Sequence, residues 1–255
     1  MYDTFIFLPL YNGLVGIMDI LPWIDIGLAV VIFTIIVKLA LFHLSKASIL
    51  TQIKMKEVEP EANKIKAQYA NDKQAQALKV MELYKTRNVK PFAGVLLLFI
   101  QLPILLALLS VFYKIIPTIN PEYLYSFISI PIVKTQFLGL IDLTKPSFIL
   151  AIFTAIAQFV QLHYSPAMKQ VKAVSVNNQA GISPLDFAAS MNKQMKYMLP
   201  ILAFASTYWL IPMQFPQAAS IIALYWSVSA LFTLGQELVI RKQHYKVVIP
   251  AKAGI

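Results

Sequence analysis

The chain has 255 residues, of which 58% are hydrophobic and only 13% are charged. About a quarter of a typical soluble protein is charged, so this composition excludes a soluble enzyme of this length and also excludes intrinsic disorder. An integral membrane protein is favoured. The net charge of +10 is compatible with nucleic acid or an anionic membrane surface as a partner, and the absence of cysteine excludes disulfides and thiolate metal sites.

Residues 1–22 are apolar but are interrupted by Asp3, Pro9 and Asn12. They contain no Lys or Arg and no small-residue cleavage site, so they do not have the pattern of a signal peptide. We predict that they form an interfacial helix on the outer face of a membrane.

A membrane-spanning helix needs about 20 mostly apolar residues. Five stretches meet this requirement: 23–45, 91–114, 147–165, 191–211 and 217–238. Only a short turn, PMQFP, separates the last two, which predicts a tight helical hairpin. The sequence therefore predicts an all-α integral membrane protein with five transmembrane helices, whose termini lie on opposite sides of the membrane.

The basic residues fall mostly on one side of these spans. Ten lie within 46–90, four within 166–196 and four in the tail 239–255, whereas only three lie in or beside the loop 115–146. Cytoplasmic loops are enriched in Lys and Arg, so the N-terminus is predicted outside and the C-terminus inside. The positive charge then reflects mainly topology, which weakens the case for nucleic acid.

The cytoplasmic segment 46–90 has its own helical pattern. Two helices are predicted, 47–69 and 73–86, with Asn71-Asp72 as the N-cap signal of the second and Pro60 as a break or kink in the first. Sparse apolar positions predict a helical hairpin with little core: Ile49, Ile53, Val58, Ile65 and Tyr69 in the first helix, and Leu78, Met81, Leu83 and Tyr84 in the second. It is either a solvated connector or a docking arm for a partner. The later cytoplasmic segment, 166–190, is predicted to be a loop.

Lys38 is the formal charge that we place well inside a span. By insertion scales a central Lys costs about 2.5–3.5 kcal/mol, so it usually faces a partner or water. Snorkelling to the cytoplasmic interface is the alternative, because Lys38 lies only about 10 Å from that end of its helix. We expect no carboxylate inside any span, and this favours a water-filled cavity around Lys38.

Seven further polar residues, in four of the five spans, are candidates to line the same cavity: Thr34, Gln101, Gln158, Gln161, Ser227, Ser229 and Thr233. Alternatively, they only hydrogen-bond neighbouring helices, at about 0.6 kcal/mol each. The sequence has no catalytic triad, zinc motif or glycine-rich phosphate loop, so neither an enzyme nor a cofactor or metal is expected. A proton-coupled transporter usually needs an intramembrane acid and is disfavoured.

Several segments, in this order, resemble the YidC/Oxa/Alb family of membrane-protein insertases. LPLYNGLVGI resembles the family's outer-face helix, and TIIVKLALFHLSKASI resembles its first span. VKPFAGVLLLFIQLPILLAL is similar to the second span, and QFVQLHYSPAM to the end of the third. The stretch from MKYMLP to LFTLGQ resembles the paired fourth and fifth spans.

The resemblance implies an insertase or chaperone that moves nascent hydrophobic segments from the cytoplasm into the lipid bilayer through a hydrophilic groove, alone or with the Sec translocon. It implies a bacterial inner or plasma membrane location, with nascent membrane proteins, lipid, the ribosome and the translocon as partners, and no DNA. The family's groove usually carries Arg at the position of Lys38, so charge is kept but the planar guanidinium is lost. Two alternatives stay open: a transporter or channel subunit, and a structural assembly factor of a translocase.

Overall fold

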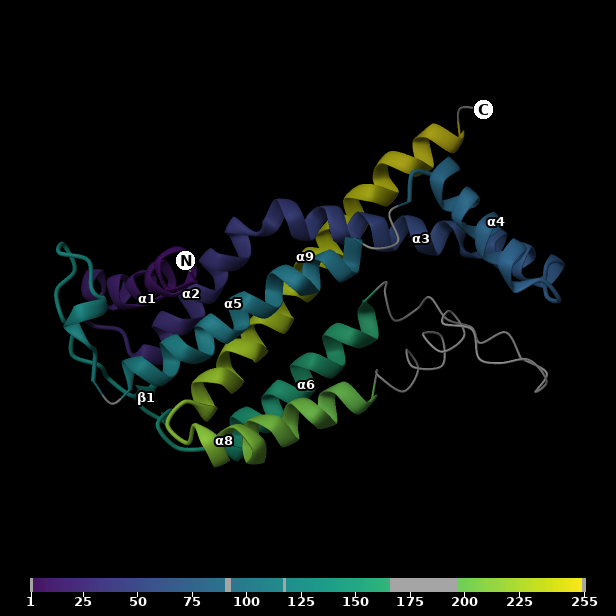
Figure 1. Cartoon of the computed structure of the whole chain (residues 1–255). Helices are drawn as coiled ribbons and strands as arrows, with labels where there is room; N and C mark the ends of the chain where they lie inside the picture. Colours follow the sequence, from purple (N-terminus) through teal and green to yellow (C-terminus); the bar gives the residue numbers. More distant parts are fainter. Residues whose placement is uncertain (1, 90–92, 117, 166–196, 254–255) are drawn as a thin grey trace. The chain divides into compact units, whose positions relative to one another are not determined.

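The computed structural model describes residues 2–89, 93–116, 118–165 and 197–253 (Figure 1). The predicted loop 166–190 and the start of the fourth predicted span lie outside the described residues. In chain order the elements are η1 (Asp3–Phe7), α1 (Leu8–Ile20), α2 (Ile26–Ala40), α3 (Phe42–Gln68), α4 (Lys73–Thr86), α5 (Ala93–Ile115), η2 (Pro121–Tyr123), β1 (Gln136–Phe137), β2 (Ile141–Asp142), α6 (Phe148–Tyr164), a helix over 197–205, η4 (Ser206–Leu210), α8 (Ile211–Gln214) and α9 (Ala219–Ala253).

Internal contacts divide the chain into two compact units. The first comprises Met1–Leu41, Phe99–Val160 and Leu199–Thr233. The second comprises Phe42–Leu98, Gln161–Met198 and Leu234–Ile255.

In the first unit, α1 packs against α2. The chain turns after Ile20, and Asp25 starts α2 as its N-cap, its Oδ1 accepting a hydrogen bond from the Leu28 N–H at 3.0 Å. The two helices approach closely at Gly13, where a Cβ would lie 2.9 Å from the Phe33 ring. This close approach explains why a residue without a side chain is needed there.

The core of the first unit is apolar and aromatic. Tyr11 and Leu14 of α1 are fully buried and belong to one cluster with Val30 of α2. Phe112 of α5 joins the same cluster and packs its ring against Tyr225 of α9, with 6.0 Å between ring centroids. This cluster holds α1, α2, α5 and α9 together. The distance between the Phe112 and Tyr225 rings is in the favourable range for an aromatic pair.

In the second unit, α3 and α4 form the predicted helical hairpin (Figure 1). The α4 bounds coincide with the predicted helix 73–86, and Asp72 is its N-cap, accepting from the Gln74 and Ala75 N–H groups. The first helix begins earlier than predicted, at Phe42, and Pro60 lies inside α3, which continues without a break to Gln68.

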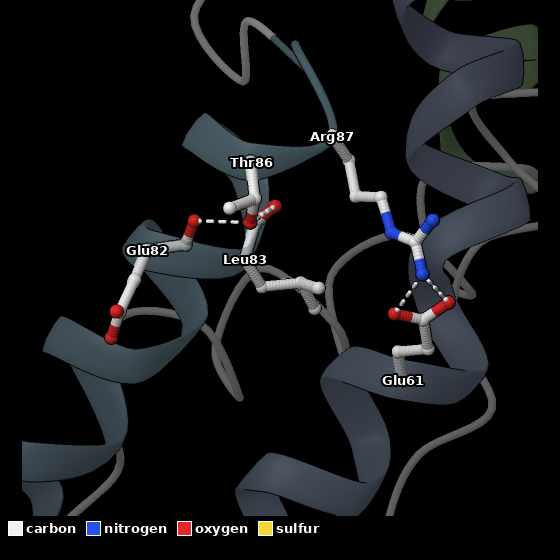
Figure 2. Close-up of polar contacts among 5 residues, drawn as sticks. All are labelled: Glu61, Glu82, Leu83, Thr86 and Arg87. Atoms are coloured by element: carbon white, nitrogen blue, oxygen red, sulfur yellow. Dashed lines mark hydrogen bonds and ion pairs between the residues drawn. The ribbon is translucent and has the colours of Figure 1, made fainter.

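Polar side chains fasten the two arms of this hairpin. Arg87 donates two hydrogen bonds to the Glu61 carboxylate, at 2.7 and 2.9 Å, as Figure 2 shows. About half of each side chain is exposed, so the pair contributes at most about 1 kcal/mol. The Gln76 amide donates to the Lys66 and Tyr69 carbonyls near the C-terminal end of α3, which caps that helix from the other arm.

The buried face of the hairpin differs from the predicted one. Val58 and Ala62 of α3 and Val80 of α4 are buried, whereas the predicted core residues Leu78 and Met81 are exposed. Those two lie on a different side of α4 from Val80. The predicted Ile49 and Ile53 are buried, but they pack against Ile240 of α9 and not against α4.

The fold is helical and has membrane character, as predicted. Among the described residues, Asp3–Ile20 and Ala219–His244 are long and apolar enough to cross a membrane, and a third span results if α2 and α3 count as one bent span. Pro103–Ile115 and Phe148–Tyr164 are shorter apolar helices. The number of five spans and their orientation remain predictions.

Candidate functional site

Lys38 and Thr233 lie together in the first unit. Lys38 is half-buried near the end of α2, and its Nζ donates a hydrogen bond to Thr233 Oγ1 of α9 at 3.3 Å. The Thr233 hydroxyl in turn donates to the Ser229 carbonyl at 2.8 Å. The structure therefore connects three predicted site residues, Lys38, Thr233 and Ser229. Lys38 and Thr233 are 195 positions apart in the sequence.

Thr34 lies one helical turn before Lys38, on the same face of α2. Its side chain is buried, and its hydroxyl donates to the Val30 carbonyl of the same helix at 2.6 Å. Thr34 thus satisfies its hydroxyl proton locally, which is a common arrangement for Thr in apolar helices.

Ser227 belongs to a separate polar cluster. Its hydroxyl is fully buried, donates to the Ala223 carbonyl at 2.8 Å and lies 3.0 Å from the Thr154 hydroxyl of α6. Thr154 also lies within hydrogen-bonding distance of the Ala223 carbonyl, at 2.9 Å. These contacts join α6 to α9, so Ser227 contributes to helix packing.

The three predicted glutamines do not form one group. Gln158 is half-buried on α6 in the first unit. Gln161 lies in the second unit, where its side chain hydrogen-bonds Glu237. The side chain of Gln101 lies outside the described residues.

Glu237 corrects the expectation that the spans hold no carboxylate. It lies within the predicted span 217–238 and within the apolar stretch Ala219–His244 of α9. Its side chain is only 5% exposed, and its Oε1 accepts a hydrogen bond from the Ser165 hydroxyl at 3.0 Å. The objection to a proton-coupled transporter that rested on the lack of an intramembrane acid therefore fails.

The sequence analysis missed Thr154, Ser165 and Glu237, although α6 carried a usable signal. Thr154, Gln158, Gln161 and Ser165 follow one another at spacings of four, three and four, which places them on one face of a helix. A polar stripe of this kind on an apolar helix predicts polar partners on the helix packed against it.

Metal binding has no support in the described part of the chain, where no group of three or more His, Asp and Glu side chains lies close enough to hold a metal ion. The hydrogen bonds described around Lys38 involve its ammonium group, the Thr233 hydroxyl and the Ser229 carbonyl.

Comparison with known proteins adds a family to this geometry. The model of the 60Kd inner membrane protein family matches residues 18–247. The chain belongs to this family. Its membership confirms the family resemblance seen in the motifs and, with the apolar helices, the predicted location in a bacterial inner membrane.

Curated relatives carry the name membrane protein insertase YidC. The protein of Fusobacterium nucleatum subsp. nucleatum is 28% identical over 219 residues, which cover 86% of this chain and 87% of the relative. That of Clostridium tetani is 30% identical over 225 residues, covering 88% and 86%. The protein of Anaeromyxobacter sp. (strain Fw109-5) is 29% identical over 230 residues, covering 89% of this chain but 35% of the relative.

This chain therefore spans most of some relatives and about a third of others. The matched part of the longer relatives corresponds to nearly the whole of this chain. Lys38, Thr233, Ser227 and Glu237 all lie inside the region that the family model matches.

Proposed function

We propose that this protein is a membrane protein insertase, which receives nascent hydrophobic segments on the cytoplasmic side and releases them into the bilayer. The family and the printed name of its relatives support this function. The observation that carries it in the structure is the half-buried Lys38 ammonium, held at 3.3 Å by a neutral hydroxyl on another apolar helix.

Lys38 is well suited to attract an acidic flank of a passing segment. Its partner Thr233 is uncharged, so this contact does not neutralise the ammonium. Two unit charges 4 Å apart attract by about 4 kcal/mol at an effective dielectric constant of 20, compared with about 1 kcal/mol in water. A cation among apolar helices thus attracts an acidic tail more strongly than the same cation would in water.

The finer parts of the proposal follow from the sequence. Five spans, an outside N-terminus and an inside C-terminus place 18 of the 22 basic residues in the cytoplasm. Residues 1–22 then lie on the outer face as an interfacial helix, and a hydrophilic groove contains Lys38 and its neighbours. The α3–α4 hairpin is the docking arm, with the ribosome and the Sec translocon as partners.

Replacement of Lys38 tests the role of the charge. In cells depleted of their own insertase, the Lys38→Ala variant is expected to insert a client with an acidic translocated tail about tenfold more slowly, equivalent to about 1.4 kcal/mol. Lys38→Arg should keep most of the activity. Thr233→Val is the matched control, because it removes the hydroxyl contact but keeps the charge.

A client whose acidic tail residues are replaced by Asn and Gln should be insensitive to Lys38→Ala. If the unmodified protein, Lys38→Ala and Lys38→Arg all insert the acidic client equally well, Lys38 only snorkels to the interface. Failure of the unmodified chain to insert any client, although it is itself correctly inserted, would refute the insertase proposal.

Buried Glu237 keeps a transporter as the second candidate function, because transport proteins use intramembrane acids. Solute uptake into proteoliposomes, together with no crosslink from position 38 or 158 to a ribosome-bound nascent chain, would favour that candidate. Crosslinks without uptake would favour the insertase.

A further inference from the structure

The loop between α5 and α6 has apolar side chains directed outward. Five of its large apolar residues are between 58% and 87% exposed: Phe127, Ile130, Ile132, Leu138 and Leu140. Loops in contact with water are usually polar, and a concentration of exposed apolar residues marks an interaction surface. We call these five residues the loop tip.

The backbone of this loop is firmly held, so the exposure does not result from a loose segment. Asn12 of α1 accepts a hydrogen bond from the Tyr125 N–H at 2.7 Å and donates one to the Tyr123 carbonyl at 2.7 Å. Asp19 accepts from the Ser129 N–H at 3.2 Å. The polar side chains of α1 thus fix the first half of the loop.

The second half is fixed on the start of α2. Oδ2 of Asp25, the N-cap of that helix, accepts from the Leu138 N–H at 3.1 Å. The Phe137 ring packs against Gly27, where any Cβ would collide with it. Ile26 N–H donates to the Lys134 carbonyl at 2.9 Å. The β1–β2 hairpin is therefore docked against the N-terminal end of α2.

The turn of this hairpin has an unusual residue. Leu138 has φ of 52° and Gly139 has φ of 71°. Gly or Asn is common at positive φ in a hairpin turn, whereas Leu is strained there. The strained backbone holds an exposed apolar side chain at the end of the hairpin. A hairpin turn exposed to water more commonly has Gly or Asn at such a position.

We propose that the loop tip inserts into the interfacial region of the adjacent bilayer leaflet. Large apolar residues are also exposed at both neighbouring span starts: Trp23 before α2, and Phe148 and Ile149 at the start of α6. Lipid covers such residues in a membrane protein, and Trp is characteristic of the interface. The loop tip is fixed through Asp25 to the start of α2, two residues after Trp23, and therefore meets the same bilayer.

The polar residues of the loop agree with this placement. Glu122 and Lys145 are exposed near its two ends, and Lys145 pairs with Asp142 at 3.4 Å. Between these charged ends lie the apolar residues of the tip and one further charge, Lys134, whose ammonium donates to the Pro22 carbonyl at 2.9 Å. The loop thus has the division between an apolar and a polar part that interfacial segments show, with the apolar part entering lipid.

The test uses the absence of cysteine in the chain. A single Cys is introduced at Ile132 or at Leu140, and as a matched control at Glu122, which lies in the same loop. Each variant is labelled with the environment-sensitive dye NBD and reconstituted in phospholipid vesicles. Quenching is measured with iodide in the water and with nitroxide-labelled lipid. All three positions are exposed, so the labels should not disturb the fold.

The labels at 132 and 140 should emit at shorter wavelength than the label at 122, and nitroxide lipid should quench them about threefold more strongly. Quenching by iodide as strong as at position 122 would overturn the proposal. Protection from both quenchers would also overturn it, because a protein would then cover the tip, either a second copy or another chain. Dilution of the protein in the vesicles would distinguish those two.

Discussion

Exchanging Glu237 for Gln and for Ala separates its hydrogen bond from its charge. The wild-type carboxylate is 5% exposed and accepts from the Ser165 hydroxyl at 3.0 Å. Gln keeps the length of the side chain and one acceptor oxygen, and it removes a buried charge whose desolvation opposes folding. We therefore expect the free energy of unfolding of Glu237→Gln to equal or exceed that of the wild type, within about 0.5 kcal/mol.

Glu237→Ala removes the acceptor and leaves the buried Ser165 hydroxyl without it. A hydrogen bond between membrane helices is worth about 0.6 kcal/mol, up to about 1.7, and an unpaired buried polar group costs about 1–3 kcal/mol. We expect a loss of about 1–3 kcal/mol. The attraction between Glu237 and Arg241, one turn further along α9, changes this little because Arg241 is partly exposed and screened.

The measurement is unfolding in mixed lipid–detergent micelles by increasing amounts of sodium dodecyl sulfate, followed by circular dichroism. Ser165→Ala is the control, since it removes the donor of the same hydrogen bond. The double variant should show a coupling of about 0.6 kcal/mol with Glu237→Ala. The reasoning fails if Gln destabilises the protein as much as Ala does, because the charge itself would then be required.

Two further predictions concern the loop between α5 and α6. Gly27→Ala should lower the unfolding temperature, at a cost of about 1–3 kcal/mol, and a simultaneous Phe137→Ala should cost less than the sum of both single changes because the collision is relieved. The Thr144 hydroxyl and N–H both donate to Asp142 and lower the pKa of its carboxyl. The ionised carboxylate therefore stabilises the loop fully at a pH above the ordinary carboxyl pKa. This stabilisation is lost as the pH falls through the lowered pKa. Thr144→Val should raise the Asp142 pKa toward its usual value in an NMR titration.

Signals close together in the sequence predicted well. The bounds of α4 and its cap at Asp72 follow from an N-cap residue and the helix that it starts, and both are local features. The beginning of α3 was predicted five residues too late, because Phe42 and Leu44 fit the end of the predicted span as well as the start of the next helix.

Features that depend on a distant partner were harder to predict. Leu78 and Met81 are larger apolar residues than Val80, yet Val80 is the one that is buried. The side of a weakly amphipathic helix that becomes buried depends on the helix opposite. Glu237 is visible within the predicted span 217–238, whereas its contact with Ser165, just after α6 and 72 positions earlier, leaves no local pattern.

The pairing of Lys38 with Thr233 was expected only as a convergence of polar spans. Their spacing of 195 residues leaves no local pattern. What the sequence did provide was the scarcity of charge in the apolar stretches, which made Lys38 conspicuous. The separate cluster of Thr154 and Ser227 shows why membrane-depth hydroxyls cannot all be assigned to one site.

The direction of the Thr233 hydroxyl determines how easily Lys38 changes partner. Its proton is committed to the Ser229 carbonyl, so it offers Lys38 only a lone pair. At 3.3 Å the contact is longer than the usual N–H···O hydrogen bond. If Lys38 binds acidic segments as proposed, an arriving carboxylate can therefore take over the ammonium without breaking a strong bond. When that carboxylate departs, the hydroxyl is already oriented to receive the ammonium again, so each exchange ends with the same arrangement from which it began.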